Sequence, residues 1–404
     1  MYASVHTDRS GRAFVSDDHT AAAMDGAEAV PFAEGIPLPA GSELVPLARD
    51  AVAYDRAGRP RPLGKGRLAL AAVLPPDFVR HLFPAYRDEE DAAPLEALPY
   101  SAVAADDKGE LVVAAERLRE NETLAEDRAG GGPAARATVR DYGANTLARQ
   151  LARCARENAC EAARAGLGRG VLPVPLGAPP AEKPRLPVAL RSGYAGAPTE
   201  RAAFRPDARE VVAVASGHLE RGGTAIAFGR ACDGEPLALV RVLEEAITGI
   251  RERSPGADVR LETSAPDPAA LRRALDAGLG AITVRLGSAR PDTYETLHGP
   301  IAHRWSDVRA SLQLAAERDV RITIALLVLP GLTDRPAEVD ALVALLGELP
   351  GGHVELRDLG SDPLRALRAF RRGAGGGIRA LLARIAEADH FRVSVAHGSA
   401  ARAG

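Results

Sequence analysis

The pattern of apolar and polar residues changes along the chain, from short alternating runs to a regular succession of apolar runs and amphipathic stretches. The regular part is clearest in residues 224–253, where a short apolar run, an acidic loop with two glycines and an apolar stripe at helical spacing follow one another. Pro236 stands where a helix tolerates proline, in its first turn. The loop Gly229–Glu235 would then lie at the carboxyl end of a strand, where α/β proteins build their ligand sites.

The same alternation continues toward the C-terminus. Further strands are predicted at Val259–Leu261, Ala281–Leu286, Arg321–Leu329 and Val354–Leu359, with helical periodicity between them. Such alternation predicts parallel strands joined by right-handed crossovers. Five or six units of this kind predict an α/β fold, a partial (β/α)6 TIM-like barrel with an N-terminal α+β extension.

The rest of the chain divides around this barrel. Residues 1–40 are rich in Ala, Gly, Asp and Pro without a sustained period and are expected to be poorly ordered. Residues 41–140 are interpreted as the N-terminal α+β domain and residues 141–170 as one connecting helix. The barrel is predicted over residues 171–372, followed by a C-terminal helix, strand and tail in residues 373–404.

Composition and charge exclude several classes of partner. The 404 residues carry a net charge of -3 with interleaved signs, which gives no electrostatic reason to expect nucleic acid or an anionic membrane. The first residues lack the apolar core of a secretory signal, and the longest apolar run, Ile322–Pro330, is too short to span a bilayer. We therefore expect a cytoplasmic protein that binds a small-molecule ligand or a protein partner.

The three cysteines, Cys154, Cys160 and Cys232, are too few for a disulfide framework in a chain of this size. Cys154 and Cys160 are six residues apart and would lie about 120° from each other around a single helix. They cannot chelate one metal ion from one helix face, and we interpret them as small apolar fillers. His218, late in a predicted helix, is expected to be a partly exposed surface residue.

Four segments, each just after a predicted strand, resemble motifs of the radical S-adenosylmethionine (radical SAM) superfamily. They are CDGEPL at 232–237, RLGSARPDTYETLHGP at 285–300, LVLPGLTD at 327–334 and LRDLGSDP at 356–363. The likeness covers roughly residues 171–362. It implies a partial (β/α)6 barrel that holds a [4Fe-4S] cluster and S-adenosylmethionine at the carboxyl ends of its strands.

The resemblance also implies cofactor-binding residues. Gly234, Glu235 and Pro236 match the part of the glycine-rich acidic motif whose backbone holds the amino group of the methionine moiety, and Asp233 replaces the motif's usual first glycine. Ser288 falls where a polar residue meets the ribose or the carboxylate.

The remaining implied contacts come from later strand ends. Gly331 and Asp334 match the turn that passes near the adenine, and Asp358 would lie at the rim of the same pocket. Thr263, after the third predicted strand, completes the set of cofactor-binding candidates.

One departure from the family pattern decides the main hypothesis. The Cys-x3-Cys-x2-Cys loop should stand at about Gly177–Leu190, and this stretch contains no cysteine. Three thiolates normally hold the cluster, and alanine, proline and lysine cannot replace soft anionic ligands. The sequence therefore favours a degenerate barrel that binds S-adenosylmethionine or a nucleoside without radical cleavage, or that serves as a protein-binding scaffold.

Two alternatives stay open. A functional radical SAM enzyme could assemble its [4Fe-4S] cluster with non-standard ligation, for which Cys232 is the one candidate at a strand end. A barrel enzyme could instead use carboxylate acid/base or divalent-metal chemistry. The side chains available for that chemistry are Asp233, Glu235, Glu262, His298, Asp334 and Asp358.

Overall fold

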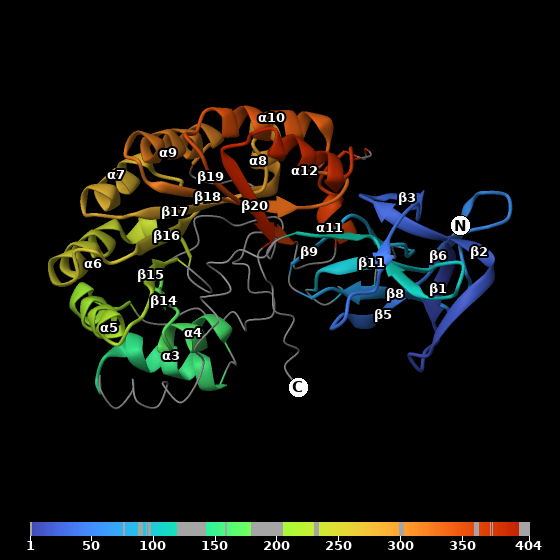
Figure 1. Cartoon of the computed structure of the whole chain (residues 1–404), viewed down its shortest axis with the longest axis horizontal. Helices are drawn as coiled ribbons and strands as arrows, with labels where there is room; N and C mark the ends of the chain where they lie inside the picture. Colours follow the sequence, from blue (N-terminus) through green and yellow to red (C-terminus); the bar gives the residue numbers. More distant parts are fainter. Residues whose placement is uncertain are drawn as a thin grey trace.

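The protein has an N-terminal domain of β-strands and a parallel sheet surrounded by helices, as the computed structural model in Figure 1 shows. The structure describes residues 2–75, 77–87, 92–93, 95, 98–118, 143–157, 160–178, 205–229, 234–298, 303–358, 363–371, 373 and 375–395. Among these residues, no helix is both long and apolar enough to cross a membrane.

The N-terminal domain is built from antiparallel pairs. Its main sheet has the order β4-β12-β11-β8-β1-β2-β6-β7, β3 and β10 also pair with β2, β5 with β8, and β9 pairs with β13 separately. The strands are β1 Ala3–Thr7, β2 Ala13–Asp25, β3 Glu28–Pro31, β4 Ile36–Pro37, β5 Glu43–Asp50, β6 Val52–Tyr54, β7 Pro60–Pro62, β8 Leu68–Val73, β9 Phe78–Arg80, β10 Phe83–Pro84, β11 Tyr100–Ala105, β12 Leu111–Val113 and β13 Ala115–Arg117.

This domain differs from the sequence prediction in two ways. Residues 1–40, expected to be poorly ordered, form β1 to β4, and the described part of residues 41–118 contains strands rather than a mixture of helices and strands. The strands were missed because alanine forms much of this core. Ala21, Ala23, Ala102 and Ala104 are buried together in one cluster. Small side chains of this kind carry little periodic signal in the sequence.

The predicted connecting helix at residues 141–170 is two helices in the described residues, α3 Thr146–Glu157 and α4 Glu161–Leu167. The main-chain N–H of Cys160 donates to the carbonyl oxygen of Cys154 at 3.0 Å, and Arg164 Nε donates to the carbonyl oxygen of Ala155 at 3.0 Å. These bonds satisfy carbonyl groups that the end of α3 leaves without helical partners. The prediction of one helix was therefore wrong.

The second region is a parallel sheet whose strands follow chain order, with the consecutive order β14 to β20. The strands are β14 Val171–Val174, β15 Ala225–Phe228, β16 Val259–Thr263, β17 Ala281–Leu286, β18 Arg321–Val328, β19 Gly352–Asp358 and β20 Phe391–Val395. The α/β class is therefore observed, and the sheet is open because β14 does not pair with β20, as expected of a partial barrel. The sheet has seven strands rather than six, so the specific (β/α)6 arrangement is not confirmed. The seventh strand is the C-terminal one that we had placed outside the barrel.

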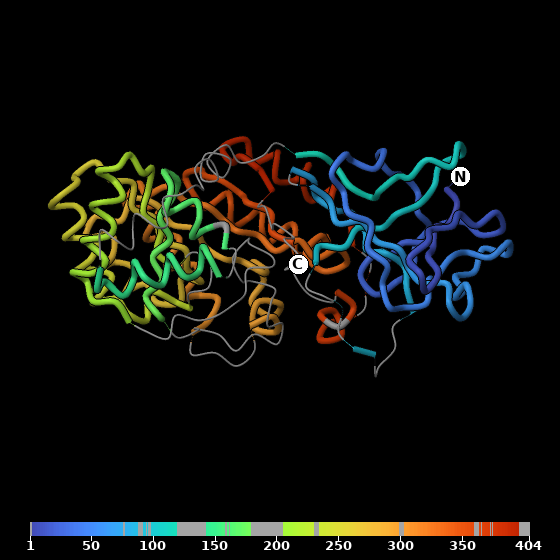
Figure 2. The backbone as a smooth tube through the Cα atoms, turned by 90° about the horizontal axis from the view of Figure 1, so that it is seen from below, coloured from blue at the N-terminus to red at the C-terminus, as the bar shows by residue number. Residues whose placement is uncertain are grey.

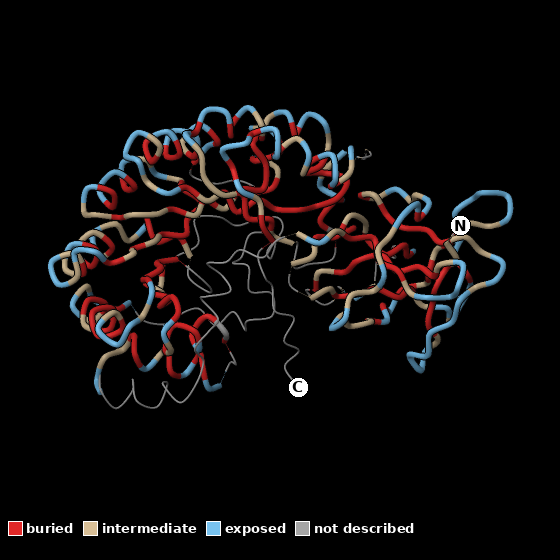
Figure 3. Tube along the Cα trace, in the orientation of Figure 1, coloured by how far each residue is buried: buried red, intermediate tan, exposed pale blue. Residues whose placement is uncertain are grey.

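Helices cover the outer face of this sheet, and their exposed residues lie on the outside of the molecule (Figure 3). The helices of this region are α5 Ala208–Glu220, the 3-10 helix η1 Pro236–Leu239, α6 Val240–Arg253, α7 Pro268–Asp276, α8 Pro291–His298, α9 Trp305–Glu317, α10 Pro336–Gly347, α11 Pro363–Leu367 and α12 Ile378–Ala386, and α11 packs at the junction with the N-terminal domain. In β17 the buried Ile282, Val284 and Leu286 alternate with half-buried Thr283 and Arg285. Because side chains alternate between faces, Arg285 points to the inner face, away from the apolar core beneath the helices.

The two regions meet at the carboxyl ends of β18 and β19 (Figure 2). One apolar cluster contains Met24, Phe83 and Tyr86 of the N-terminal domain together with Leu329 and Leu332, which follow β18. Burial of apolar surface therefore docks the N-terminal domain onto one part of the sheet.

Candidate functional site

The residues on either side of the loop after β15 pack against β16. Gly229 has a φ of +74°, and a Cβ there would lie 2.1 Å from the carbonyl oxygen of Glu262. Only glycine fits such a left-handed, close approach. Glu235 is the N-cap of η1 and accepts from the N–H of Leu237 at 3.2 Å, and Pro236 follows in the first helical position.

The Glu235 carboxylate connects this loop to the end of β16. The residue is only 1% exposed, and it accepts from Thr263 Oγ1 at 2.6 Å and from the N–H of Ser264 at 2.8 Å. Arg285 Nη2 lies 3.5 Å from its Oε2. Burial raises the pKa of Glu235, while Arg285 and the three hydrogen bonds oppose that rise. The side chain thus fixes the position of Gly234, Glu235 and Pro236.

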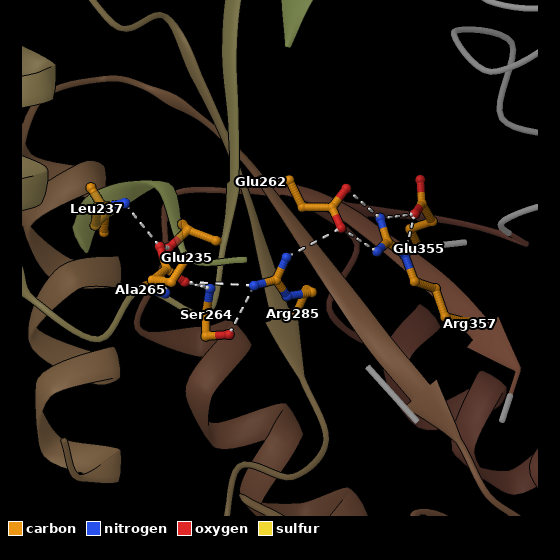
Figure 4. Close-up of polar contacts among 9 residues, drawn as sticks. Glu235, Leu237, Glu262, Ser264, Ala265, Arg285, Glu355 and Arg357 are labelled. Atoms are coloured by element: carbon orange, nitrogen blue, oxygen red, sulfur yellow. Dashed lines mark hydrogen bonds and ion pairs between the residues drawn. The ribbon is translucent and has the colours of Figure 1, made fainter. Parts of the chain in front are cut away.

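From Glu235, a chain of alternating charges runs across the inner face of the sheet (Figure 4). Arg285 Nη1 lies 3.7 Å from Glu262 Oε1, and Arg357 Nη1 donates to the same Glu262 oxygen at 2.8 Å. Arg357 Nε donates in turn to Glu355 Oε1 at 2.7 Å. We call the five residues Glu235, Arg285, Glu262, Arg357 and Glu355 the charge ladder.

Strand register explains how these side chains meet. Arg285 of β17, Ala325 of β18 and Glu355 of β19 are consecutive register partners. The short Ala325 side chain therefore leaves room for long charged side chains to reach one another across β18. Burial lowers the pKa of Arg357, but the carboxylates of Glu262 and Glu355 more than offset it and leave that pKa above its usual value.

Gly331 and Asp334 lie at a different strand end, where Gly331 contacts the N-terminal domain. Asp334 Oδ1 accepts from the N–H of Gly331 at 2.7 Å, and Asp334 Oδ2 accepts from the N–H of Gly377 at 3.2 Å. Burial, reinforced by the nearby Asp25, raises the pKa of Asp334 to about 6. The main chain of Gly331 touches Gly26 in the turn between β2 and β3.

Asp358 forms an ion pair with a residue of the N-terminal domain. Its Oδ1 lies 3.0 Å from Arg80 Nε, and the Arg80 side chain is 2% exposed. Arg80 Nη1 also donates to the carbonyl oxygen of Tyr100 at 3.0 Å. Burial raises the pKa of Asp358, and the Arg80 guanidinium opposes this rise.

Ser288 stands in a third place, in the loop between β17 and α8. Its hydroxyl donates to Glu338 Oε2 at 2.5 Å and accepts from the N–H of Arg290 at 2.9 Å. Thr293 Oγ1 donates to the other Glu338 oxygen at 2.6 Å. The hydroxyl of Ser288 therefore ties its loop to α10.

The structure brings only part of the predicted set together. Gly234, Glu235, Pro236 and Thr263 form one connected group, which does not include Ser288, Gly331, Asp334 or Asp358. Cys232 and Asp233 lie outside the described residues, as does the cysteine-free stretch after Ala178 up to residue 204. Arg285 and Glu355 were missed, although a charged residue between apolar neighbours in a predicted strand is a readable signal.

The described residues do not fit the cluster that the resemblance implies. Cys154 and Cys160 are buried on the segments that precede β14. The inner face offers carboxylates and guanidiniums that bond to one another, whereas a [4Fe-4S] cluster takes thiolates. Across the described ranges, no group of three or more His, Cys, Asp or Glu side chains is arranged to hold a metal ion.

Comparisons with known proteins found similarity among solved structures alone. No family model matches the chain, and the comparison with curated proteins gave no match. Similar solved structures include a radical SAM methyltransferase from Sphaerobacter thermophilus, with 19% identity, coverage of 52% of this chain and 62% of that chain, and a TM-score of 0.35. Another is the radical S-adenosylmethionine methyltransferase TsrM from Kitasatospora setae, with 18% identity, coverage of 42% and 34%, and a TM-score of 0.33.

A third is coproporphyrinogen III oxidase (HemN), a radical SAM enzyme from Escherichia coli, with 13% identity, coverage of 44% and 43%, and a TM-score of 0.33. The chain is thus similar in structure to radical SAM enzymes. It spans less than two thirds of each of these proteins, and at such TM-scores we draw no conclusion about activity from them.

Proposed function

We propose that this protein is a degenerate radical SAM-like protein that binds S-adenosylmethionine or a related nucleoside at the carboxyl ends of β15 to β17 without cleaving it. The observation that carries the proposal is the buried Glu235 carboxylate, which accepts from Thr263, Ser264 and Leu237 and so holds the loop Gly234–Pro236 in one conformation. A loop fixed in advance binds a ligand without the cost of ordering its own backbone.

In this proposal the main chain of Gly234, Glu235 and Pro236 meets the ammonium group of the methionine moiety. The Glu235 carboxylate acts as a positioning group, since its oxygens are engaged by protein donors. Arg285, beside it on β17, keeps this carboxylate paired with a positive charge.

The absence of cleavage follows from the missing ligands. Reductive cleavage needs an electron from an iron–sulfur cluster, and cluster assembly needs thiolates near the end of the first strand. Residues 171–198 contain no cysteine. We therefore derive no redox step and propose recognition alone.

The carboxylate-enzyme alternative has less support. Glu235 is bonded to three donors, Glu262 to Arg357, Asp334 to two main-chain N–H groups and Asp358 to Arg80. Carboxylate oxygens that already accept from protein donors have fewer lone pairs left to take a proton from a substrate, although burial raises the pKa of Glu235, Asp334 and Asp358.

Isothermal titration calorimetry with S-adenosylmethionine tests the proposal. The wild-type protein should release or absorb measurable heat that saturates, and Glu235→Gln should weaken binding by roughly 5- to 100-fold, because an amide nitrogen facing an N–H or O–H donor leaves that donor unsatisfied. Glu348→Gln is the matched control, since Glu348 pairs with Arg309 on the helical surface. No saturable heat at millimolar ligand would remove the proposal.

Anaerobic reconstitution with iron and sulfide separates the proposal from a functional radical SAM enzyme. The expected preparation is colourless, without stoichiometric iron, and produces no 5′-deoxyadenosine from S-adenosylmethionine under reducing conditions. A brown preparation that yields 5′-deoxyadenosine would show that another ligand set assembles the cluster.

A further inference from the structure

The junction between the two regions contains a pair of carboxylates on one glycine segment. Asp25, at the end of β2, accepts through Oδ2 from the N–H of Gly375 at 3.0 Å. Asp334 accepts through Oδ2 from the N–H of Gly377 at 3.2 Å, and a Cβ on Gly375 would lie 2.1 Å from that oxygen. Gly375 therefore touches both carboxylates, one from each side of the junction.

The main chains of the two regions also touch at this point. Gly26 and Gly331 have φ values of +61° and +80°, and a Cβ on Gly331 would lie 2.2 Å from the Cα of Gly26. No side chain separates the turn between β2 and β3 from the loop that follows β18. Glycine main chain therefore forms the contact between the regions, and both carboxylates lie beside it.

Few charges neutralise this pair. Glu28 of β3 adds a negative charge near Asp25, and Arg335 at the start of α10 is the positive group that faces it. The Arg335 guanidinium donates to the carbonyl oxygens of Gly331 at 2.6 Å and Arg371 at 2.9 Å, so carbonyl groups use its N–H donors.

One oxygen of the Asp25 carboxylate is available to carry a proton. The buried Oδ1 of Asp25 has no hydrogen-bond donor among the residues that the structure describes. A buried carboxylate oxygen without a donor costs free energy when ionised, and it becomes a donor itself when protonated.

We propose that Asp25 and Asp334, which both lie beside Gly375, retain one proton as a pair at the junction, and that loss of this proton with rising pH loosens the N-terminal domain from the sheet. Two carboxylates that share a site cannot both ionise without repulsion, so one proton is retained at a pH where isolated carboxylates have lost theirs.

The direction of the pKa shifts agrees with this arrangement. Burial raises the pKa of Asp25, and burial together with Asp25 raises the pKa of Asp334 to about 6. A carboxyl group with a raised pKa in the docked state stabilises docking most at low pH, and this contribution is lost as the pH rises through about 6. The apolar cluster and the Arg80–Asp358 pair remain at high pH, so the proton sets how often the junction opens.

Hydrogen–deuterium exchange measured by mass spectrometry tests the proposal on the full chain. Protection factors corrected for intrinsic exchange should fall roughly tenfold in peptides 24–33 and 329–337 between pH 5.0 and pH 7.5. A peptide that covers β16 and β17, residues 259–286, is the internal control, and its corrected protection factor should be the same at both pH values.

Asp25→Asn provides the decisive variant. The amide oxygen of the variant can keep the contact with the Gly375 N–H, and its amide nitrogen is a donor that does not titrate. The tenfold decrease should therefore shrink to the part that burial of Asp334 causes alone. Asp107→Asn, at an exposed position in the turn after β11, should behave as the wild type does. If wild-type protection at the junction does not change with pH, or if Asp25→Asn follows the wild-type pH course, the proposal is wrong.

Discussion

The strands β15 to β17 and the strands β18 and β19 belong to one sheet, but different parts of the protein contact their carboxyl ends. At β15 to β17, the loop with Glu235 is held by Thr263, Ser264 and Arg285 of the neighbouring strands. At β18 and β19, Gly331 and Asp358 contact the N-terminal domain instead, and Asp334 lies near Asp25 of that domain. Residues that one family resemblance groups into a single pocket therefore have two structural roles, and the ligand proposed above depends on the first group.

The electrostatics of the two regions also differ. In the charge ladder, each buried arginine lies between two carboxylates, so removal of one member leaves others without compensation. At the domain junction, Arg80 and Asp358 form a separate pair, and Asp25 and Asp334 carry the same sign. Breaking a buried ion pair lowers the free energy of unfolding more than breaking an exposed one does, and the loss should be larger in a network of pairs.

Arg357→Ala should have the largest effect on stability. Without this guanidinium, Glu355 would lose its cation and Glu262 would keep the longer contact with Arg285, at 3.7 Å, so we expect the free energy of unfolding to fall by about 3 to 5 kcal/mol. Urea unfolding followed by circular dichroism measures this change.

The control for this variant is Arg309→Ala, which removes an exposed bidentate pair with Glu348 from the helical surface. It should change the unfolding free energy far less. Equal losses for the two arginines would mean that the ladder contributes no more than a surface ion pair.

Arg80→Met should have the second largest effect, and it should act at the junction. Asp358 would stay without its guanidinium, but its side chain is 24% exposed, so we expect a loss of about 2 to 3 kcal/mol, near the lower end for such pairs. Limited proteolysis should then release the N-terminal domain more quickly from the variant than from the wild type.

Arg117→Met is the matched control in the same domain. Arg117 pairs with Asp77 and lies over the ring of Phe78, as Arg80 lies over Phe83, but its side chain is largely exposed. If both variants release the domain at the same rate, the Arg80–Asp358 pair does not hold the junction.

The sequence predicted the parallel sheet better than it predicted the site. The spacing of apolar residues along the chain predicts strands 259–263 and 281–286 and the helix between them. The pairing of Glu262 with Arg357 joins residues 95 positions apart and depends on strand register, which spacing along the chain does not contain.

The N-terminal domain shows the same limit. Asp334 and Asp358 follow predicted strands and were read as pocket residues, but their partners Asp25 and Arg80 come from segments whose pattern suggested loose order or an unspecified domain. Only the folded chain reveals which of two surfaces a strand end meets. His218 is a further correction, because it is 2% exposed rather than a surface residue.

His218 gives the last prediction, in which the two regions respond to pH in opposite directions. Burial, with a smaller contribution from Arg221, lowers the pKa of His218 to about 4, although its Nε2 bonds to the carbonyl oxygen of Gly170 at 2.9 Å. A histidine with a lowered pKa stabilises the fold above its ordinary value of 6.5, and this stabilisation is lost as the pH falls toward 4. Between pH 6.5 and pH 5.0 the opening free energy of α5 should fall by about 1 to 2 kcal/mol.

Over the same pH range, protection at the Asp25–Asp334 junction should rise, so exchange in peptides 208–220 and 24–33 should change with opposite signs. His218→Gln can keep a donor toward Gly170 without titrating and should remove the response of α5 alone. His390→Gln, whose ring bonds to the carbonyl oxygen of Leu346 at a more exposed position, should leave both responses unchanged. If protection in the two peptides instead changes with the same sign, α5 and the junction open as one cooperative unit. The two regions would then not differ in how pH affects their stability.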